Sequence, residues 1–178
     1  MNVRAVLLII APALSFVLTG CQNLPPPYAP PEQRVPLPDF RSYRVTRMVD
    51  MSDGDVRDHV VADILGDSGS WRWTGKRPSV KVVLRGNQNI RYLIDFTIAD
   101  ATYKTTGPVT VSFFINDHVL DTVLYDKPGT QHFEKAVPAA WVVPDKETIV
   151  GAEVDKVWVS PDDGAKLGLI LTRIGLTE

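Results

Sequence analysis

The chain has 178 residues, a formal net charge of −2, a pI of about 5.9 and 44% hydrophobic residues. With this slightly negative charge, the chain lacks the excess of basic residues with which proteins bind nucleic-acid phosphates, so nucleic acid is excluded as a partner. Without its N-terminal segment, the chain is long enough for one ordinary domain with a single core, and two domains are not expected.

The first 20 residues have the composition of a secretion signal. Arg4 supplies positive charge, residues 5–18 form an apolar run, and small residues close the segment. A membrane-spanning helix needs about 20 apolar residues, and this shorter run is also interrupted by Pro12. We therefore expect residues 1–20 to be an export signal that is removed from the mature protein.

The signal ends in Leu18, Thr19, Gly20 and Cys21. This pattern resembles the lipobox of bacterial prolipoproteins, in which a peptidase cleaves before a cysteine that already carries diacylglycerol. Cys21 is the only cysteine of the chain, so it has no partner for an internal disulfide. The resemblance implies that Cys21 is lipidated and attaches the protein to a membrane. The alternative is an ordinary signal peptide with a chance cysteine near its cleavage site.

Gln22 and a run of prolines follow the cysteine. In lipoproteins of bacteria with two membranes, Asp at this position tends to retain the protein in the inner membrane, so the resemblance implies that Gln22 favours the outer membrane. Prolines crowd residues 24–38, and proline fixes its own backbone torsion and lacks a donor. Residues 21–40 are thus expected to form an extended tether, with a polyproline ligand for a partner's groove as the alternative.

The domain is expected to span residues 41–178. Residues 43–49 are a weak strand candidate, and Asp53 and Asp55 then provide acidic capping residues for one short N-terminal helix. Its apolar face would consist of Val56, Val60, Ile64 and Leu65.

Beyond this helix, apolar and polar residues alternate, as they do in half-buried strands. Asn116 and Asp117 form a turn signal between two such runs, which predicts a hairpin. Residues 167–171 are apolar on both faces, as in a central strand. Together the pattern predicts an all-β fold with two antiparallel sheets. The expected strands cover residues 80–84, 92–98, 109–115, 119–125, 131–137, 148–159 and 166–176.

Four short motifs carry a resemblance to a known fold. They are Trp-Arg-Trp (71–73), Gly-Pro (107–108), Phe-Ile-Asn-Asp (114–117) and Ser-Pro-Asp-Asp-Gly-Ala-Lys-Leu-Gly (160–168). Their order resembles that of galactose-binding-like jelly-roll domains, the architecture of many carbohydrate-binding modules. The resemblance implies a jelly-roll β-sandwich that binds sugars on aromatic rings near loop ends and often holds a structural calcium ion. Such an analogy of fold does not by itself establish a function.

The tryptophans are the candidate sugar-stacking residues. Trp158 lies within an expected strand, and Trp71 and Trp73 share one side of an extended segment, so at least two are expected in the core. Trp141 follows two alanines in an expected loop, which makes it the candidate for lining a ligand site.

Asp162 and Asp163 are the candidate polar residues of the same site. Their carboxylates could accept hydrogen bonds from sugar hydroxyls or ligate calcium. An ordinary turn with Pro161 before it and Gly164 after it is the alternative. In jelly-roll modules the loops at one end of the sandwich, or the concave face of one sheet, carry the ligand, so these residues are expected to converge with Trp141.

Catalytic motifs in this chain have simpler explanations. Residues 66–69 read Gly-Asp-Ser-Gly, as around the nucleophile of chymotrypsin-like proteases, but only His59 precedes Ser68, a few residues away. A loop of small residues that ends the helix explains this stretch. The three histidines also lack the spacing of zinc ligands. No catalytic or metal-binding residue is therefore predicted.

The sequence thus favours a membrane-anchored cell-envelope lipoprotein with a non-catalytic binding or structural module. A polysaccharide or another envelope protein is the expected partner, and calcium is the inorganic group that the resemblance implies. The alternative is an enzyme acting on envelope glycans, for which the sequence offers no recognisable pair of carboxylates and no nucleophile.

Overall fold

The computed structural model describes residues 46–66 and 69–177. All of them belong to one compact unit, Phe40–Glu178. Cys21, the tether and Ser68 lie outside this described part, so the interpretations placed on them stay predictions. Within the described ranges, no helix is both long enough and apolar enough to cross a membrane.

The described residues are mostly β-structure with short helices, which confirms the expected all-β class. The strands are β1 (Met48–Asp50), β2 (Val60–Ile64), β3 (Arg72–Val83), β4 (Arg91–Ile98), β5 (Val109–Ile115), β6 (His118–Tyr125), β7 (Gly129–Ala136), β8 (Glu147–Val154), β9 (Trp158–Val159), β10 (Lys166–Leu167) and β11 (Ile170–Thr177). The helical segments are α1 (Val56–His59), α2 (Asp100–Thr106) and η2 (Ala139–Trp141).

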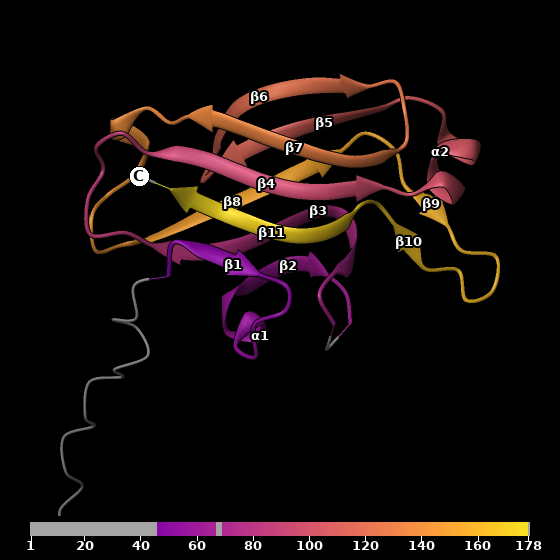
Figure 1. Ribbon diagram of the computed structural model, residues 1–178, viewed down its shortest axis with the longest axis horizontal. Helices are drawn as coiled ribbons and strands as arrows, with labels where there is room; N and C mark the ends of the chain where they lie inside the picture. Colours follow the sequence, from indigo (N-terminus) through magenta and orange to yellow (C-terminus); the bar gives the residue numbers. More distant parts are fainter. Residues whose placement is uncertain (1–45, 67–68, 178) are drawn as a thin grey trace, which may run out of the picture. The chain divides into compact units, whose positions relative to one another are not determined.

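The strands form two antiparallel layers, which we call the front layer and the back layer after the view in Figure 1. The front layer has the order β1-β11-β4-β7, and the back layer has the order β2-β3-β8-β5-β6. The long strand β3 joins them, because Arg72 and Trp73 at its start pair with β11, whereas Ser79 and the residues after it pair with β8. β9 and β10 form a separate small hairpin. The expected two-sheet architecture and the 109–125 hairpin are confirmed.

The core lies between the inward faces of the two layers. Phe113 of β5 stacks on Phe133 of β7 with the ring centroids 3.8 Å apart. The hydroxyl of the buried Tyr92 crosses from β4 and donates to the carbonyl oxygen of Gly151 in β8 at 2.9 Å. Burial of one large apolar side chain contributes roughly 1.5–3 kcal/mol, so such contacts hold the layers together.

The helix expected over residues 56–65 is largely wrong. α1 ends at His59, and Val60 adopts an extended backbone from which β2 pairs with β3. Because Val60 and Val61 are β-branched, they suit a strand, and pairing with β3 supplies hydrogen bonds that one short helix cannot match. The predicted capping is also not seen at Asp55, the N-cap of α1, whose side chain makes no capping hydrogen bond.

Other element boundaries differ from the expected ones. α2 has no counterpart among the predicted elements, because a seven-residue helix that buries only Thr102 lacks a repeated apolar spacing. The segment 166–176 divides into β10 and β11 at Gly168, where a Cβ atom would lie 2.4 Å from the carbonyl oxygen of Gly75. β11 is nevertheless central, with β3 and β4 as its neighbours, as its apolar sequence predicts.

Candidate functional site

The residues predicted to bind a ligand lie at opposite ends of the sandwich. Trp141 belongs to the connection between β7 and β8, whereas Asp162 and Asp163 lie in the β9–β10 turn, close to α2 (Figure 1). β5 begins just after α2, and Asn116 at its other end donates a hydrogen bond to the Trp141 carbonyl oxygen at 3.0 Å. A strand of that length spans roughly 23 Å, so the expected convergence of the two loops is wrong.

Trp141 is partly buried. Its ring stacks on that of His118, with centroids 4.7 Å apart and 18° between the planes, and it packs against the core. The most exposed tryptophan among the described residues is Trp71, at 50%, and neither Trp73 nor Trp158 is fully buried, so the expectation that at least two of these three lie in the core is wrong. Trp71 precedes the first residue of β3, so the strand alternation does not direct its side chain inward. Trp73 and Trp158 are partly buried.

Asp162 and Asp163 are both exposed in their turn. Asp163 Oδ1 accepts the backbone N–H of Ala165 at 3.1 Å. A hydrogen bond with the Ser160 side chain, and then the one from Ala165, holds the pKa of Asp163 below its ordinary value. These contacts are those of an ordinary turn. In the described part of the chain, no three His, Cys, Asp or Glu side chains are grouped to hold a metal ion.

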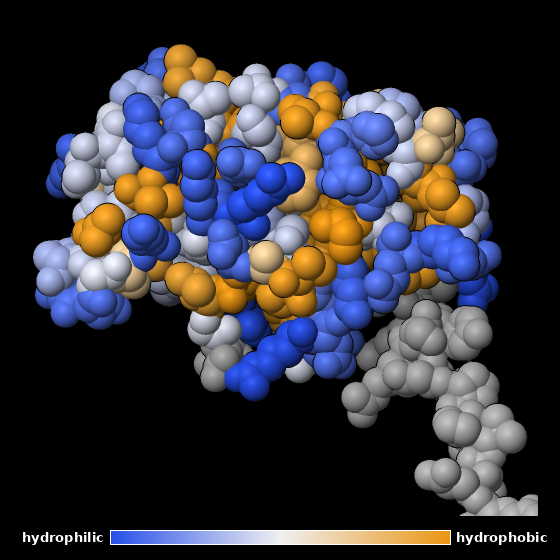
Figure 2. Space-filling view, turned by 180° about the vertical axis from the view of Figure 1, so that it is seen from behind, coloured by the Kyte–Doolittle hydropathy of each residue, from blue (hydrophilic) through white to orange (hydrophobic). Residues whose placement is uncertain are grey.

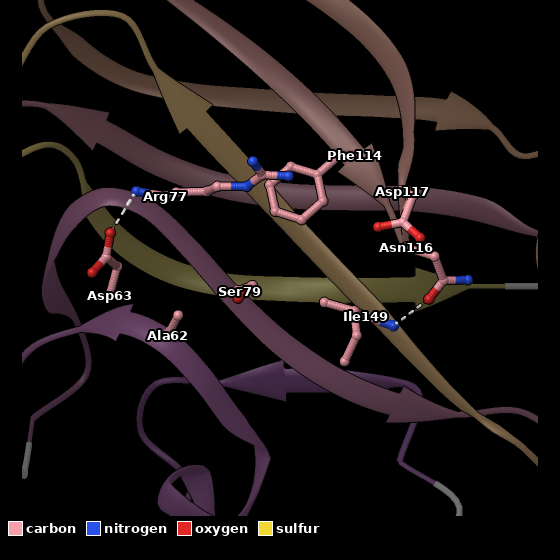
Figure 3. A pocket seen from close by; sticks show the side chains of 8 residues that line it. All are labelled: Ala62, Asp63, Arg77, Ser79, Phe114, Asn116, Asp117 and Ile149. Carbon is pink, nitrogen blue, oxygen red and sulfur yellow. Dashed lines mark hydrogen bonds between the residues drawn. The ribbon is translucent and has the colours of Figure 1, made fainter.

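A shallow hollow of about 400 Å³ lies on the outer face of the back layer. Figure 2 shows the domain from behind, with apolar and charged side chains mixed over the surface. Figure 3 shows the hollow itself and the strands that contribute to it. It is lined by Ala62 and Asp63 of β2, Arg77 and Ser79 of β3, Phe114 of β5, Asn116 and Asp117 of the β5–β6 turn, and Ile149 of β8. We take this hollow as the candidate site.

The floor of the hollow depends on close contact between Phe114 and Gly151. A Cβ atom on Gly151 would lie 2.3 Å from Phe114 Cζ and 2.5 Å from the carbonyl oxygen of Pro78, so a side chain at this position has no room. On its other side the ring is covered by the guanidinium of Arg77, 4.5 Å from the ring centroid. A cation in this position is attracted by the face of the ring. Phe114 is therefore only 5% exposed, although its strand face points outward.

The Asp63 carboxylate is held in position by three features. Its φ angle is 55°, in the left-handed region, which Asp adopts more readily than most other residues except glycine. Its Oδ2 accepts the backbone N–H of Arg77 at 2.8 Å. The carboxylate also lies over Gly75, where a Cβ atom would approach Asp63 Cγ to 2.8 Å. The conformation of Asp63 thus depends on its neighbours on β3.

At one side of the hollow, the Asn116 side chain connects the β5–β6 turn to β8 and to the β7–β8 connection. Its Oδ1 accepts the Ile149 N–H at 2.9 Å and its Nδ2 donates to the Trp141 carbonyl oxygen at 3.0 Å (Figure 3 shows the former). Both ends of the amide are therefore used within the protein. This side chain also places Trp141 beside the hollow, although Trp141 does not line it.

Two further polar groups face the hollow. Ser79 is 5% exposed, and its hydroxyl makes no hydrogen bond to any described residue. Asp117 is exposed, and its carboxylate has neither a hydrogen-bond donor nor a basic partner in that part of the chain. Both groups can accept hydrogen bonds from a ligand.

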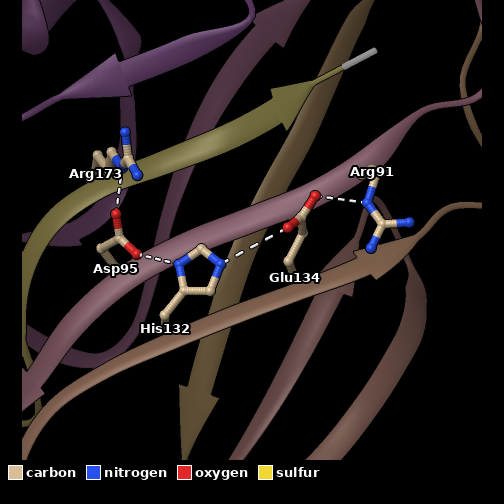
Figure 4. Close-up of polar contacts among 5 residues, drawn as sticks. All are labelled: Arg91, Asp95, His132, Glu134 and Arg173. Carbon is tan, nitrogen blue, oxygen red and sulfur yellow. Dashed lines mark hydrogen bonds and ion pairs between the residues drawn. The ribbon is translucent and has the colours of Figure 1, made fainter.

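The outer face of the front layer carries a second polar cluster. Figure 4 shows that basic and acidic side chains alternate across three strands in the order Arg91, Glu134, His132, Asp95 and Arg173. Arg91 Nε donates to Glu134 at 2.5 Å, His132 Nδ1 lies 2.5 Å from Asp95 Oδ1, and Arg173 also donates to Asp95. His132 Nε2 is 3.8 Å from Glu134 Oε2.

Both carboxylates of this cluster have lowered pKa values. Burial alone would raise the pKa of Asp95, but the hydrogen bonds from His132 and Arg173 outweigh it. The hydrogen bond from Arg91 is the main cause that lowers the pKa of Glu134. A carboxylic acid that donates a proton to a glycosidic oxygen needs a raised pKa, so this cluster is better suited to stabilising the sheet surface.

The sequence does not identify the hollow. Asp63 lies in the segment predicted as helix, and Asn116 and Asp117 are predicted only as a turn. One signal was present: Phe113 and Phe114 are adjacent in an alternating strand, which places one of the two rings on the outer face.

Comparisons with known proteins give only distant similarity. No protein-family model and no curated protein matches the chain. Among solved structures, the chain is similar to an acetyl xylan esterase from the rumen bacterium Butyrivibrio proteoclasticus, with 14% identity and a TM-score of 0.45, covering 74% of this chain and 32% of that one. It is also similar to a family GH115 4-O-methyl-α-glucuronidase with specificity for decorated arabinogalactans, with 8% identity and a TM-score of 0.42, covering 76% of this chain and 18% of the enzyme. In both cases the chain spans a minor part of a longer protein.

Proposed function

We propose that this protein is an exported cell-envelope lipoprotein, attached to a membrane through Cys21, and that its β-sandwich is a non-catalytic module that binds a glycan. In a bacterium with two membranes, the proposed location is the outer membrane, because Gln22 rather than Asp follows the lipidated cysteine.

The anchor is supported by the sequence around Cys21. The lipobox-like pattern places a single cysteine at the end of an export signal. Each buried methylene of an acyl chain contributes about 0.8 kcal/mol, and two or more chains hold a protein stably at a membrane where one does not. The proline-rich residues 24–38 would then separate the domain from the membrane surface.

The observation that carries the glycan-binding proposal is the hollow of the back layer. Its apolar lining comes from Ala62 and Ile149, beside the Phe114 ring that Arg77 covers, and its rim carries the acceptors Asp63, Ser79 and Asp117. A sugar ring has the complementary surface, with an apolar C–H face and hydroxyl donors at its edge. Ligand sites typically combine an apolar lining with a few placed polar groups in this way.

A non-catalytic role is supported by the state of the carboxylates. Asp95 and Glu134, which lie on either side of His132, both have lowered pKa values and basic partners. A glycoside hydrolase of the usual kind would need one carboxyl group with a raised pKa facing the substrate. The described carboxyl groups whose pKa values shift are all shifted downward.

The test is binding of the full-length protein, in a zwitterionic detergent without a sugar headgroup, to an array of bacterial polysaccharides. Ala62→Tyr fills the hollow from an exposed edge-strand position, and Val61→Tyr is the matched control. Val61 is the preceding residue of β2, is also exposed and does not line the hollow.

We expect Ala62→Tyr to weaken binding by at least about tenfold, which corresponds to about 1.4 kcal/mol, and Val61→Tyr to leave it unchanged. Equal affinities of the two variants for every bound glycan would remove the hollow as the site. If no polysaccharide binds the wild-type protein, the glycan-binding proposal is wrong.

A further inference from the structure

Acidic side chains on the described sheet faces generally have basic partners. Glu153 pairs with Arg77 at 3.3 Å, Glu147 with Lys81 at 3.4 Å, and Asp121 with Lys135 at 2.7 Å. Asp95 and Glu134 are paired in the cluster of Figure 4. Such pairing satisfies the carboxylates without any ligand.

The two carboxylates of the hollow do not follow this rule. Among the described residues, Asp63 has no basic side-chain partner, and only its Oδ2 is engaged, by the backbone N–H of Arg77. Its left-handed φ angle and its position over Gly75 hold the other oxygen in place. Asp117, across the hollow, has no partner in the same part of the chain. The hollow therefore contains two negative charges that are not neutralised by a bound base.

A third acceptor lies between them. Ser79 is 95% buried as a residue, since only 5% of its surface is exposed, and its hydroxyl opens into the hollow with no partner among the described residues (Figure 3). The oxygen is not sealed from solvent, so a donor in the hollow can reach it. This hydroxyl is an observation independent of the carboxylates, and it offers a third polar contact to a ligand.

The floor of the hollow already holds a cation. The Arg77 guanidinium lies over the Phe114 ring and is kept there by Glu153, which Lys76 also approaches at 3.8 Å. The position of the Arg77 guanidinium shows that the face of the Phe114 ring is compatible with positive charge. A negatively charged sugar would approach Asp63 and Asp117, the two unpaired carboxylates, and would be repelled.

We propose that the glycan unit bound in the hollow carries a free, protonated amine, as in an amino sugar without its N-acetyl group. This inference rests on the proposed glycan-binding function and specifies the ligand of the same site. The ammonium group of one such unit would donate to Asp63 Oδ1 and that of a further unit to Asp117, hydroxyls between them would donate to Ser79, and the C–H faces of the rings would lie against Ala62 and Ile149.

The experiment measures binding of the full-length protein to four probes at about pH 6, where amines are protonated. The probes are a tetramer of glucosamine, the same tetramer fully N-acetylated, a tetramer of galacturonate, and tetralysine. The variants are Asp117→Asn and Ser79→Ala. Asp100→Asn, an exposed residue of α2 at the far end of β5, is the matched control.

We expect the glucosamine tetramer to bind wild type about tenfold or more tightly than the N-acetylated one, and this difference to shrink as salt screens the charges. Asp117→Asn should lower the affinity for the amine form about tenfold and leave that for the N-acetylated form unchanged, since it removes charge and little else. Ser79→Ala should weaken both sugars, and Asp100→Asn should change neither.

Equal binding of the two glucosamine forms, or stronger binding of galacturonate, overturns the inference. If the Ala62→Tyr variant binds either glucosamine tetramer more weakly than wild type does, the proposed glycan-binding function survives that result. If tetralysine binds as tightly as the amine sugar and responds equally to Asp117→Asn, charge alone is recognised and the inference is wrong. If none of the sugars binds and polysaccharide arrays are also negative, the proposed function itself fails.

Discussion

Gly151→Ala tests the contact on which the floor of the hollow depends. Carbon atoms in contact lie about 3.5–4.0 Å apart, whereas the new Cβ would be 2.3 Å from Phe114 Cζ. The ring would have to move by more than about 1 Å, and the Pro78 carbonyl oxygen, at 2.5 Å, belongs to backbone that cannot rotate away. The strand must therefore shift, although the Tyr92 hydroxyl bonds the Gly151 carbonyl oxygen from the core side.

The size of the effect follows from two opposing contributions. Overpacking a well-packed site costs about 1–3 kcal/mol. Replacing glycine by alanine stabilises by about 0.4–1 kcal/mol, because the unfolded chain loses freedom. We expect a net loss of about 1–2 kcal/mol, or roughly 3–8 °C in melting temperature for a domain of this size. Urea denaturation and thermal melting followed by circular dichroism measure it.

Gly54→Ala is the matched control, because a Cβ atom at Gly54 has no neighbour within 4 Å. Its stability should match that of wild type or exceed it by up to about 1 kcal/mol, because only the contribution of the unfolded chain remains. The penalty of Gly151→Ala should also shrink in a Phe114→Leu background, because contacting residues are not additive. If Gly151→Ala is no less stable than Gly54→Ala, the close contact between Phe114 and Gly151 is wrong.

Four further predictions concern the anchor, the domain boundary and the two surfaces. Cys21→Ser should abolish fatty-acid labelling in cells and leave unprocessed precursor, and undiminished label would end the lipoprotein proposal. A chain beginning at Arg41 should melt cooperatively, because the proline tether adds little to a core; aggregation that is cured by restoring residues 24–38 would move the boundary. Trp141→Ala should lower the free energy of unfolding by about 1–3 kcal/mol, as measured by thermal melting. This is less than the roughly 3–5 kcal/mol lost with a fully buried ring, because Trp141 is only partly buried. A change near zero would place its ring in solvent. The folded-state pKa of Asp95 is lowered, so its contribution to stability is present above its unfolded pKa and is lost as the pH falls through the folded value. When urea unfolding is repeated at decreasing pH below about 4, the Asp95→Asn variant should therefore lose less stability than wild type. Parallel losses of stability in the two proteins would contradict the contacts assigned to Asp95.

The strands and the fold class could be predicted because they depend on local alternation. In β4, residues such as Tyr92 and Ile94 face the core and their neighbours do not, and this period of two is visible in the sequence itself. The β5–β6 hairpin follows from the Asn116-Asp117 turn, because its two strands adjoin. Local patterns were insufficient for β2, where Val60 and Ile64 suit one helical face as well as a strand, and only the pairing with β3 decides between them.

The candidate site could not be predicted, because it depends on which strands become neighbours. Asp63, Arg77 and Ile149 come from three strands that meet only after β3 has paired with both β2 and β8. The register of the β5–β8 pairing places Gly151 opposite Phe114, and a slip of one residue would reverse every side chain between core and surface. Residue types alone predicted an export signal, a proline-rich tether and an alternating β domain, of which the structure tests and confirms the β domain. The tertiary structure decided that Trp141 and Asp162 lie at opposite ends and that Asp63 and Asp117 face one hollow, because such distances are set by pairing between distant segments of the chain.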